Sequence, residues 1–411
     1  MTHTTYIKEF TKGDKNHYSF CKLNELYELY KSELFEKTLP FWINNCVDKE
    51  FGGFTMALDR QGKIIDTDKG MWQQGRFTWL LGHLYNNYSR DEEWLSLVEH
   101  GIKFIDSYGF DTKDGRMWFH VTQDGKPIRK RRYSFTETFA CIAYAEYAKA
   151  TGSNEYKSKA IDLFSAYQNF LDSPQENPKF EETRPTIGIG RYMIDIVTLQ
   201  ILRETIEFEK ANEIIDNCIA VIEKLFVKDD IKCVMETVTP EGEILDHFDG
   251  RMLNPGHAIE CAWFIMKEGI IRQNDRYKAL GCKMLDWMWE RGWDKEFGGI
   301  LYFRDVYDKP VQEYWQDMKF WWPQNETVIA TLMAYSITGD CKYAKMHKLI
   351  HDWTFAHFPD EEYGEWYGYL HRDGSVSTDL KGNLWKGPFH MPRMNFECMQ
   401  TIHSLRERLN A

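Results

Sequence analysis

Hydrophobic residues recur every three to four positions over most of the chain, which is the pattern of amphipathic α-helices. This periodicity first runs through residues 20–45 and then continues in shorter blocks that turns rich in Gly and Asp separate. We predict the further helices at residues 70–88, 93–107, 134–151, 155–172, 190–208, 210–226, 255–268, 275–290, 323–338, 342–357 and 394–409. The chain is therefore predicted to be all-α, with about twelve helices that fall into pairs.

Short alternating segments between the helices indicate small β-hairpins. The first is predicted at residues 56–64, after the turn Phe51-Gly52-Gly53-Phe54, which resembles Phe297-Gly298-Gly299-Ile300. Dipeptides typical of hairpin tips are Gln61-Gly62, Asp114-Gly115, Asp124-Gly125, Glu241-Gly242 and Asp373-Gly374. Turn motifs therefore repeat along the chain together with the helices.

The starts of the helices reveal a longer repeat. Six of them lie near Gly70, Ser134, Gly190, Asn254, Trp322 and Met391, a spacing of roughly 55 to 70 residues that indicates an array of helical pairs. No Ser/Pro-rich or like-charged linker divides residues 1–411, so we predict a single domain. The pairs could form an open superhelix or close into a barrel. In a barrel, the loops before the inner helices would build the rim of one pocket.

Charge and composition narrow the classes of partner. The net charge of −12 argues against nucleic acid or an anionic membrane, because both need a basic surface. Aromatic residues make up 15% of the chain, with 15 Trp, which suits a cleft that stacks on sugar faces as well as it suits core packing.

The cysteines and the N-terminus predict a cytoplasmic protein. Nine cysteines are scattered without a CxxC pair, and reduced thiols are the simplest account of that pattern. The first residues, Met1-Thr2-His3-Thr4-Thr5, lack the charged and apolar regions of a signal peptide, and no apolar run is long enough to span a bilayer.

A helix start at residues 253–260 carries two groups that can move protons. Asn254 is a favoured N-cap and Pro255 a favoured first residue, so His257 falls in the first turn and Glu260 on the same face. The positive end of the helix dipole should keep His257 a neutral base near pH 7. In the alternative interpretation, this histidine only helps to cap its own helix.

The last helix start offers a matching histidine. His390 shortly precedes Pro392 and Arg393, so His257 and His390 stand at corresponding places in two repeats. Two neutral imidazoles that face each other suit proton removal next to a carbonyl, in which one base takes a proton and a second acid returns one to the opposite face. A fixed cation would stabilise the enediolate between these steps, and no redox cofactor is required.

The other helix starts hold candidate binding groups. Trp72, Gln73, Gln74 and Arg76 combine an aromatic ring, two amides and a cation. Arg76 could orient a hydroxyl or stabilise an oxyanion, although an arginine paired with a core carboxylate is the more common case.

Two further helix starts carry carboxylates. Ser134 and Glu137 form a capping box, so Glu137 either caps its own helix or binds a ligand. Trp321 and Trp322 precede Pro323, and Glu326 lies about one turn into that helix, as Glu260 does in its own. Polar neighbours on both sides of the Trp pair favour a pocket wall.

Other motifs are weak or missing. His347 and His351 are four residues apart and could bind a metal, but no third ligand is evident, so a solvated helix face is favoured and no metal site is predicted. The chain has no GxGxxG, GxxxxGK[ST] or GxSxG motif, so nucleotide loops and a nucleophile elbow are not indicated.

Together these segments resemble the N-acylglucosamine 2-epimerase (renin-binding protein) family. The likeness rests on residues 72–76, 254–257 with Glu260, 319–323 with Glu326, Gly364-Glu365-Trp366-Tyr367-Gly368-Tyr369 and 385–393, and it runs in matching order from about residue 20 to the C-terminus. The resemblance implies an (α/α)6 barrel with short β-hairpins in the loops at the active-site end. It also implies a homodimer that interconverts N-acetylglucosamine and N-acetylmannosamine.

The same resemblance assigns roles to residues. His257 and His390 would exchange the C2 proton of the ring-opened sugar, Arg76 and Glu326 would assist, and Glu260 would support its neighbouring histidine. Candidate substrate-binding residues are Trp72, Gln73, Gln74, Glu137, Met193, Asn254, Trp321, Trp322 and Arg393. ATP stimulates many such enzymes without being consumed, so the resemblance implies ATP as a possible allosteric activator and no cofactor for the chemistry.

Two departures from the family pattern bear on substrate and mechanism. Cellobiose 2-epimerases and aldose-ketose isomerases carry a third histidine near the start of the helix that reads Gly190-Arg191-Tyr192-Met193 here, and Met193 suits an acetamido group better than a hydroxyl. Some members have a cysteine where Pro388 stands, so a thiol role is not carried over.

Alternative functions stay open. They are a cellobiose or mannose 2-epimerase, an aldose-ketose isomerase, a glycoside hydrolase that uses Glu260 and Glu326, and a non-catalytic sugar or protein binder.

Overall fold

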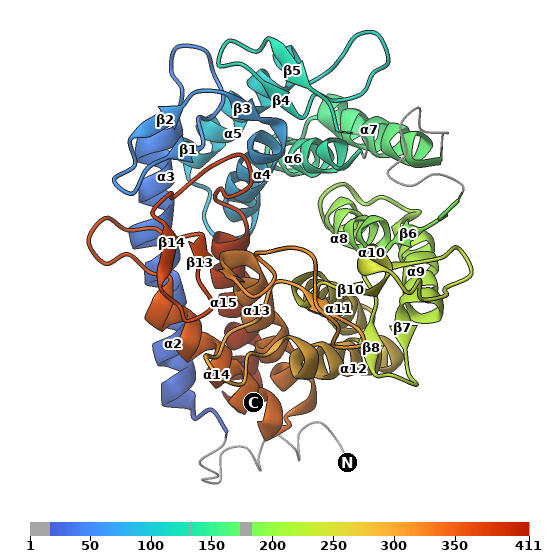
Figure 1. Cartoon of the computed structure of the whole chain (residues 1–411). Helices are drawn as coiled ribbons and strands as arrows, with labels where there is room; N and C mark the ends of the chain where they lie inside the picture. Colours follow the sequence, from blue (N-terminus) through green and yellow to red (C-terminus); the bar gives the residue numbers. More distant parts are fainter. Residues whose placement is uncertain (1–16, 132–133, 173–182, 411) are drawn as a thin grey trace.

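The computed structural model describes residues 17–131, 134–172 and 183–410, and helical pairs follow one another round a ring (Figure 1). The inner helices are α4 (Met71–Asn87), α6 (Phe135–Thr151), α8 (Ile189–Ile206), α11 (Pro255–Ile271), α13 (Trp321–Thr338) and α15 (His390–Asn410). The outer helices are α5 (Glu92–Tyr108), α7 (Asn154–Asp172), α9 (Ala211–Val221), α12 (Asp275–Gly292), α14 (Cys341–His357) and α2 (Phe20–Ser32). The helical pairs predicted from the sequence are confirmed.

The ring closes between its first and last inner helices. Each inner helix packs on an outer one, and α2, the first helix of the described chain, packs on α15, the last. Side chains complete the closure, since the rings of Trp79 and Phe389 lie 5.4 Å apart and those of His83 and Phe396 also 5.4 Å apart. The molecule is therefore a closed (α/α)6 barrel and not an open superhelix.

The inner and the outer helices differ in how much of their surface is buried. In α13 every residue from Trp321 to Ser336 is buried, because neighbouring inner helices, an outer helix and the barrel interior surround it. The outer helix α5 buries one stripe that includes Val98, Ile102 and Ile105.

None of the helices in the described part of the chain combines the length and apolar character needed to cross a bilayer.

Short strands lie at the starts of the inner helices. They are β1 (Ala57–Leu58), β2 (Ile64–Asp66), β3 (Lys69–Gly70), β4 (His120–Val121), β5 (Pro127–Arg129), β6 (Ile187–Gly188), β7 (Val227–Lys228), β8 (Cys233–Val234), β9 (Thr237–Val238), β10 (Met252–Leu253), β11 (Arg304–Asp305), β12 (Lys319–Phe320), β13 (Tyr369–Leu370) and β14 (Val376–Thr378). The antiparallel pairs β1–β2, β4–β5 and β13–β14 confirm three predicted hairpins. Strands β3, β6, β10 and β12 directly precede α4, α8, α11 and α13, so these strands form part of the barrel rim.

Several boundaries differ from the prediction. The first helix is interrupted by a π-helical segment, η1 (Glu33–Thr38), before α3 (Leu39–Cys46), and a second, η2 (Ile222–Phe226), ends α9. The short helix α10 (Phe248–Arg251) was not predicted. Helices α13 and α15 start earlier than predicted, with Pro323 and Pro392 as their third residues. Proline is tolerated there because the first N–H groups of a helix have no acceptor within it.

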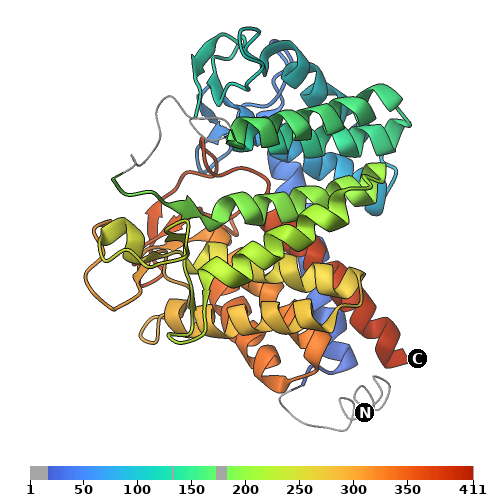
Figure 2. The same cartoon turned by 90° about the vertical axis from the view of Figure 1, so that its right-hand side faces the viewer.

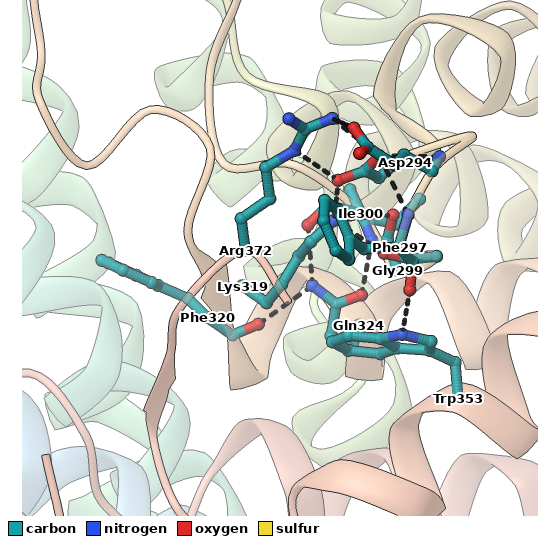
Figure 3. A network of polar contacts seen from close by, with 11 residues as sticks. Asp294, Phe297, Gly299, Ile300, Lys319, Phe320, Gln324, Trp353 and Arg372 are labelled. Atoms are coloured by element: carbon teal, nitrogen blue, oxygen red, sulfur yellow. Dashed lines mark hydrogen bonds and ion pairs between the residues drawn. The ribbon is translucent and has the colours of Figure 1, made fainter. Parts of the chain in front are cut away.

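A buried lysine anchors the start of α13 to the preceding turn (Figure 3). The Lys319 ammonium donates to Asp294 Oδ2 at 3.0 Å and to the carbonyl of Gly298 at 2.6 Å. Gln324 accepts from the N–H of Ile300 at 2.7 Å and donates to its carbonyl at 2.9 Å. Burial lowers the pKa of Lys319 to about 8 in spite of the neighbouring carboxylate.

The same anchor recurs elsewhere in the barrel. Lys69 donates to Asp48 at 2.8 Å and to the Gly52 carbonyl at 2.7 Å, and the Gln74 amide pairs with both backbone groups of Phe54. The likeness of the two Phe-Gly-Gly segments is therefore a structural repeat. Its glycines are required, since Gly298 has φ +77° and a Cβ there would lie 2.6 Å from the ring of Trp353.

We expect Asp294→Ala to lower the free energy of unfolding by roughly 3 kcal/mol, because it leaves the buried Lys319 charge without its carboxylate. Asp352→Ala is the matched control. It removes the acidic partner of an exposed pair with Lys348 and should change stability by less than about 0.5 kcal/mol. Urea denaturation of both variants measures the difference, and equal effects would contradict the proposed role of the anchor.

The histidine pair on α14 corrects one expectation. His347 and His351 are buried and not on a solvated face. The hydroxyl of Tyr18 lies 2.6 Å from His347 Nδ1, and that of Tyr30 lies 3.1 Å from His347 Nε2 and 2.9 Å from His351 Nδ1. The histidines therefore hold the N-terminal segment against α14, a role that a pattern of two residues does not reveal.

Acidification should weaken this contact. Burial lowers the pKa of His351 to about 4 and holds that of His347 well below its usual range. The unfolded chain, with histidine pKa values near 6.5, then binds more protons between about pH 6.5 and pH 4, so stability falls as the pH drops through that window.

The slope of unfolding free energy against pH should become shallower in His351→Gln, by up to about 1.4 kcal/mol per pH unit. His403→Gln replaces an exposed histidine and should keep the slope of the original protein. Urea unfolding at several pH values between 7 and 5 measures both slopes.

Candidate active site

A cavity of about 900 Å³ opens at the end of the barrel where the inner helices start. His257 from α11 and His390 from α15 both line it, together with Arg76, Glu260 and Trp322. Residues far apart in the sequence meet here because each lies in the first turns of an inner helix.

His390 is held by a buried carboxylate. Its Nδ1 lies 2.7 Å from Glu326 Oε1, and a carboxylate can only accept, so Nδ1 carries the proton and Nε2 keeps its lone pair. Burial, with additional repulsion from Arg393 and Arg76, holds the pKa of His390 well below its usual range. His390 is thus a neutral imidazole at pH 7.

One arginine bridges the two carboxylates of the cavity. Arg393 Nη2 donates to Glu260 Oε1 at 2.5 Å and to Glu326 Oε1 at 2.7 Å. The other oxygen of Glu326 accepts from Trp263 Nε1 at 2.8 Å. Burial raises the pKa of the Glu326 carboxyl, while Arg393 and Trp263 oppose this effect. Helices α11, α13 and α15 are joined through this one cation.

His257 has a different environment from the one predicted. Its Nδ1 lies 3.0 Å from Glu236 Oε1, and its backbone N–H donates to Asn254 Oδ1 at 3.2 Å. Burial lowers the pKa of His257, but Glu236 together with Glu260 and Glu326 outweighs burial, so the pKa is raised above its usual value. These carboxylates oppose the helix dipole, which was the influence on the pKa of His257 that the sequence indicated.

The ring of Trp322 lies close to both histidines. Its ring centroid is 4.9 Å from that of His257 and 5.8 Å from that of His390. Gly256 permits this approach, since a Cβ at that position would lie 2.6 Å from the Trp322 ring. The two imidazoles therefore face one space over a shared aromatic wall.

Arg76 is a half-buried cation that lines the cavity, and no ion pair joins it to a carboxylate in the described part of the chain. Its guanidinium lies over the rings of Phe139 at 4.2 Å and Phe389 at 4.6 Å, and its Nε has no hydrogen-bond partner in the described part of the chain. Burial lowers the pKa of Arg76 to about 9, so it stays charged at neutral pH. Such a group can bind an oxyanion.

The predicted binding residues divide into two sets. Trp72, Met193, Trp321, Trp322 and Arg393 line the cavity beside the histidines. Asn254 does not line it but caps α11 and contacts His257, so it positions that histidine.

The positions of three residues do not support the predicted contact with substrate. Gln73 donates to the carbonyl of Trp385 at 2.8 Å, which fixes the loop before α15. Gln74 belongs to the anchor before α4. Glu137 accepts from Arg116 Nε and from the N–H of Met117, both at 2.9 Å, so it neither caps its own helix nor faces the cavity.

Sequence reasoning missed two groups. Glu236 lies in the loop before β9 and reaches His257 from another repeat, so no local spacing could reveal it. Trp263 lies two turns into α11, and the pattern gives it only as a core residue.

One cluster has the residue types of a metal site. Ligand atoms of Glu260, Glu326 and His390 all lie within 4.8 Å of one another. However, Arg393 already donates to both carboxylates, so the position where a metal ion would balance their charge carries a guanidinium. The expectation of no metal stays a prediction.

Comparison with known proteins agrees with this geometry. The sequence matches the family profile of N-acylglucosamine 2-epimerase (GlcNAc 2-epimerase) over residues 52–390. The chain belongs to this family. The N-acylglucosamine 2-epimerase of Rattus norvegicus is 31% identical over 401 residues, which cover 94% of this chain and 95% of the relative. That of Bos taurus is 32% identical, with coverage of 91% and 90%.

Solved structures show the same fold. The cellobiose 2-epimerase from Bacillus thermoamylovorans B4167 superimposes with a TM-score of 0.80 at 22% identity, covering 92% of this chain and 99% of that one. At this identity the likeness supports the barrel architecture alone. The predicted (α/α)6 fold and the predicted family are both confirmed.

Removal of the Glu236 charge should lower the pKa of His257, since Glu236 favours the imidazolium more than Glu260 or Glu326 does. Titration of the histidine ring signals by NMR in Glu236→Gln tests this, with Glu243→Gln as a control in the same segment. An unchanged pKa of His257 in Glu236→Gln would show that another group stabilises its charge.

Proposed function

We propose that the protein is an N-acyl-D-glucosamine 2-epimerase that interconverts N-acetylglucosamine and N-acetylmannosamine. One observation carries this proposal: two imidazoles, each bound at Nδ1 by a carboxylate, line the same cavity and both lie close to the ring of Trp322. Both then present Nε2 for proton transfer, which is what inversion at a carbon next to a carbonyl requires.

The reaction acts on the ring-opened sugar. One histidine removes the C2 proton, the electron pair moves to the C1 oxygen, and the other histidine delivers a proton to the opposite face. Because C2 carries nitrogen in these sugars, the intermediate is an enolate on O1 and not the enediolate expected from hydroxy sugars. Arg76, charged and joined to no carboxylate by an ion pair among the described residues, would stabilise that oxyanion.

The two histidines differ in proton affinity. The raised pKa of His257 favours its imidazolium and the lowered pKa of His390 favours its free base. A two-base epimerase needs one protonated and one neutral group at the start of each turnover, and the roles exchange in the reverse direction. Glu326 would assist by holding the His390 ring, and Glu260 would assist indirectly through Arg393.

The substrate assignment rests on the relatives and on one wall of the cavity. The relatives at 31% and 32% identity are N-acylglucosamine 2-epimerases. Met193 lines the cavity near the start of α8, the helix on which, by the family resemblance, cellobiose 2-epimerases and aldose-ketose isomerases carry a histidine, and a thioether suits an acetamido methyl group. Activity on cellobiose or mannose is the alternative that the same assay tests.

The geometry argues against a glycoside hydrolase. Glu260 and Glu326 share Arg393 Nη2, and an oxygen of each lies within 4.8 Å of the other. An inverting hydrolase separates its carboxyl groups by roughly 6.5–9.5 Å and a retaining one by roughly 5–5.5 Å, and in both the acid must be free to donate a proton. Because Arg393 donates to both carboxylates, neither is free to act as that acid. Here the pair serves to fix an arginine and a histidine.

The chemistry proposed here consumes no cofactor, because the proton and the electron pair return to the sugar. An activating ATP and a homodimeric assembly remain proposals from the family resemblance, and a cytoplasmic location remains a proposal from the cysteine pattern.

Incubation with N-acetylmannosamine in deuterated water, followed by NMR at C2, tests the proposed function. We expect deuterium at C2 of both epimers, because each proton transfer exchanges with solvent. Conversion of cellobiose or mannose, without exchange in the N-acetyl sugar, would favour the alternative. Unlabelled sugar after long incubation with folded protein that binds it would contradict epimerisation.

His257→Gln and His390→Gln should each lower epimerisation by about 10³-fold or more, since each removes one of two proton-transfer groups. His371→Gln, which changes a histidine outside the cavity, should keep normal activity. Circular dichroism and thermal melting confirm that all three variants fold. Near-normal turnover in either cavity variant would exclude the assignment of that histidine.

A further inference from the structure

The cavity continues well past the two histidines. On α8 it is lined by Met193, Val197, Ile201 and Glu204, which follow one another at intervals of three to four residues along one face. From Met193 to Glu204 this wall runs for about 16 Å along the helix axis. Figure 2 shows α8 between the pair α6–α7 and the pair α11–α12.

This extension is apolar and incompletely packed. Phe139 and Ile142 of the adjacent helix α6 also line it, and Ile271 near the end of α11 lines the same cavity. Val197 and Ile201 stay half-exposed although α8 is an inner helix, whereas α13 is buried over nearly its full length. An inner apolar face that other protein groups do not cover is suited to an apolar part of a ligand.

Two of the charged groups that line the cavity near the extension neutralise each other. Lys267 Nζ lies 2.6 Å from Glu397 Oε1, and both residues line the deeper part of the cavity. Glu204 is exposed at the far end, as is Ile271. The extension therefore runs from the reacting centre along an apolar wall towards solvent.

We propose that this extension binds the N-acyl chain of amino sugars whose acyl group is longer than acetyl, and that the protein epimerises such sugars. This inference rests on the proposed function. The acyl group is attached through nitrogen to C2, the carbon that loses its proton, so the chain must start between the histidines. A chain that passes Met193 meets Val197 one turn later and Ile201 after another turn, each about 6 Å further along α8.

The experiment compares N-acetyl- and N-hexanoyl-D-mannosamine, which differ by four methylene groups, through deuterium incorporation at C2. We expect kcat/KM for the hexanoyl sugar to exceed that for the acetyl sugar by about tenfold, because added methylene groups leave water for an apolar wall. In Val197→Phe, which fills the extension, the ratio of hexanoyl to acetyl activity should fall by at least about tenfold.

Val221→Phe is the matched control, since Val221 is a half-buried valine on the outer helix α9 and does not line the cavity. It should leave the ratio unchanged. If Val197→Phe does not fold, Ile201→Phe narrows the extension one turn further along and should also lower the ratio.

Each outcome bears on a distinct claim. Exchange in the acetyl sugar without exchange in the hexanoyl sugar would overturn this inference and leave the proposed function intact. No exchange in either sugar would overturn the proposed function as well. Equal losses for both sugars in Val197→Phe and Ile201→Phe would show that the extension does not hold the chain.

Discussion

The candidate site depends on one buried cation. Arg393 joins a carboxylate from α11 to one from α13, and it comes itself from α15, the helix that carries His390. Burying three charges together destabilises the folded state unless each charge is paired. Here Arg393 pairs with both carboxylates, while Glu326 also holds the His390 ring and Glu260 ties in α11. The relative placement of the two imidazoles therefore depends on the ion cluster of Arg393, Glu260 and Glu326 and on the ring of Trp322, which lies close to both histidines.

The overall architecture could be predicted from the sequence because it depends on local signals. Helical periodicity, Gly-Asp turns and the spacing of Asn254, Trp322 and Met391 gave the pairs and the position of the rim. The boundaries at Pro323 and Pro392 were missed because proline is accepted within the first turn as well as at its first position. The π-helical segments at η1 and η2 carry no comparable signal.

The site was predicted in part. Both histidines and Arg393 lie at helix starts, and helix starts can be recognised from capping residues. Glu236 could not be identified from the sequence, because it contacts His257 from a separate loop and no local spacing links the two residues. Gln74 and Glu137 share the residue types and positions of ligands, but Gln74 pairs with backbone groups and Glu137 with Arg116 and a backbone N–H, and only coordinates separate these cases.

The lysine anchors have a consequence for how this barrel can change over time. Lys69 and Lys319 tie the turn before an inner helix to the helix start through backbone carbonyls and one aspartate. Lys381 restrains residues 360–365 in the same way, through Asp360 and the carbonyls of Gly364 and Glu365. The hairpin tips at Asp124-Gly125 and Asp373-Gly374 lie outside these three turns. Insertions there could reshape the mouth, and with it the range of sugars admitted, while the bases underneath keep their spacing.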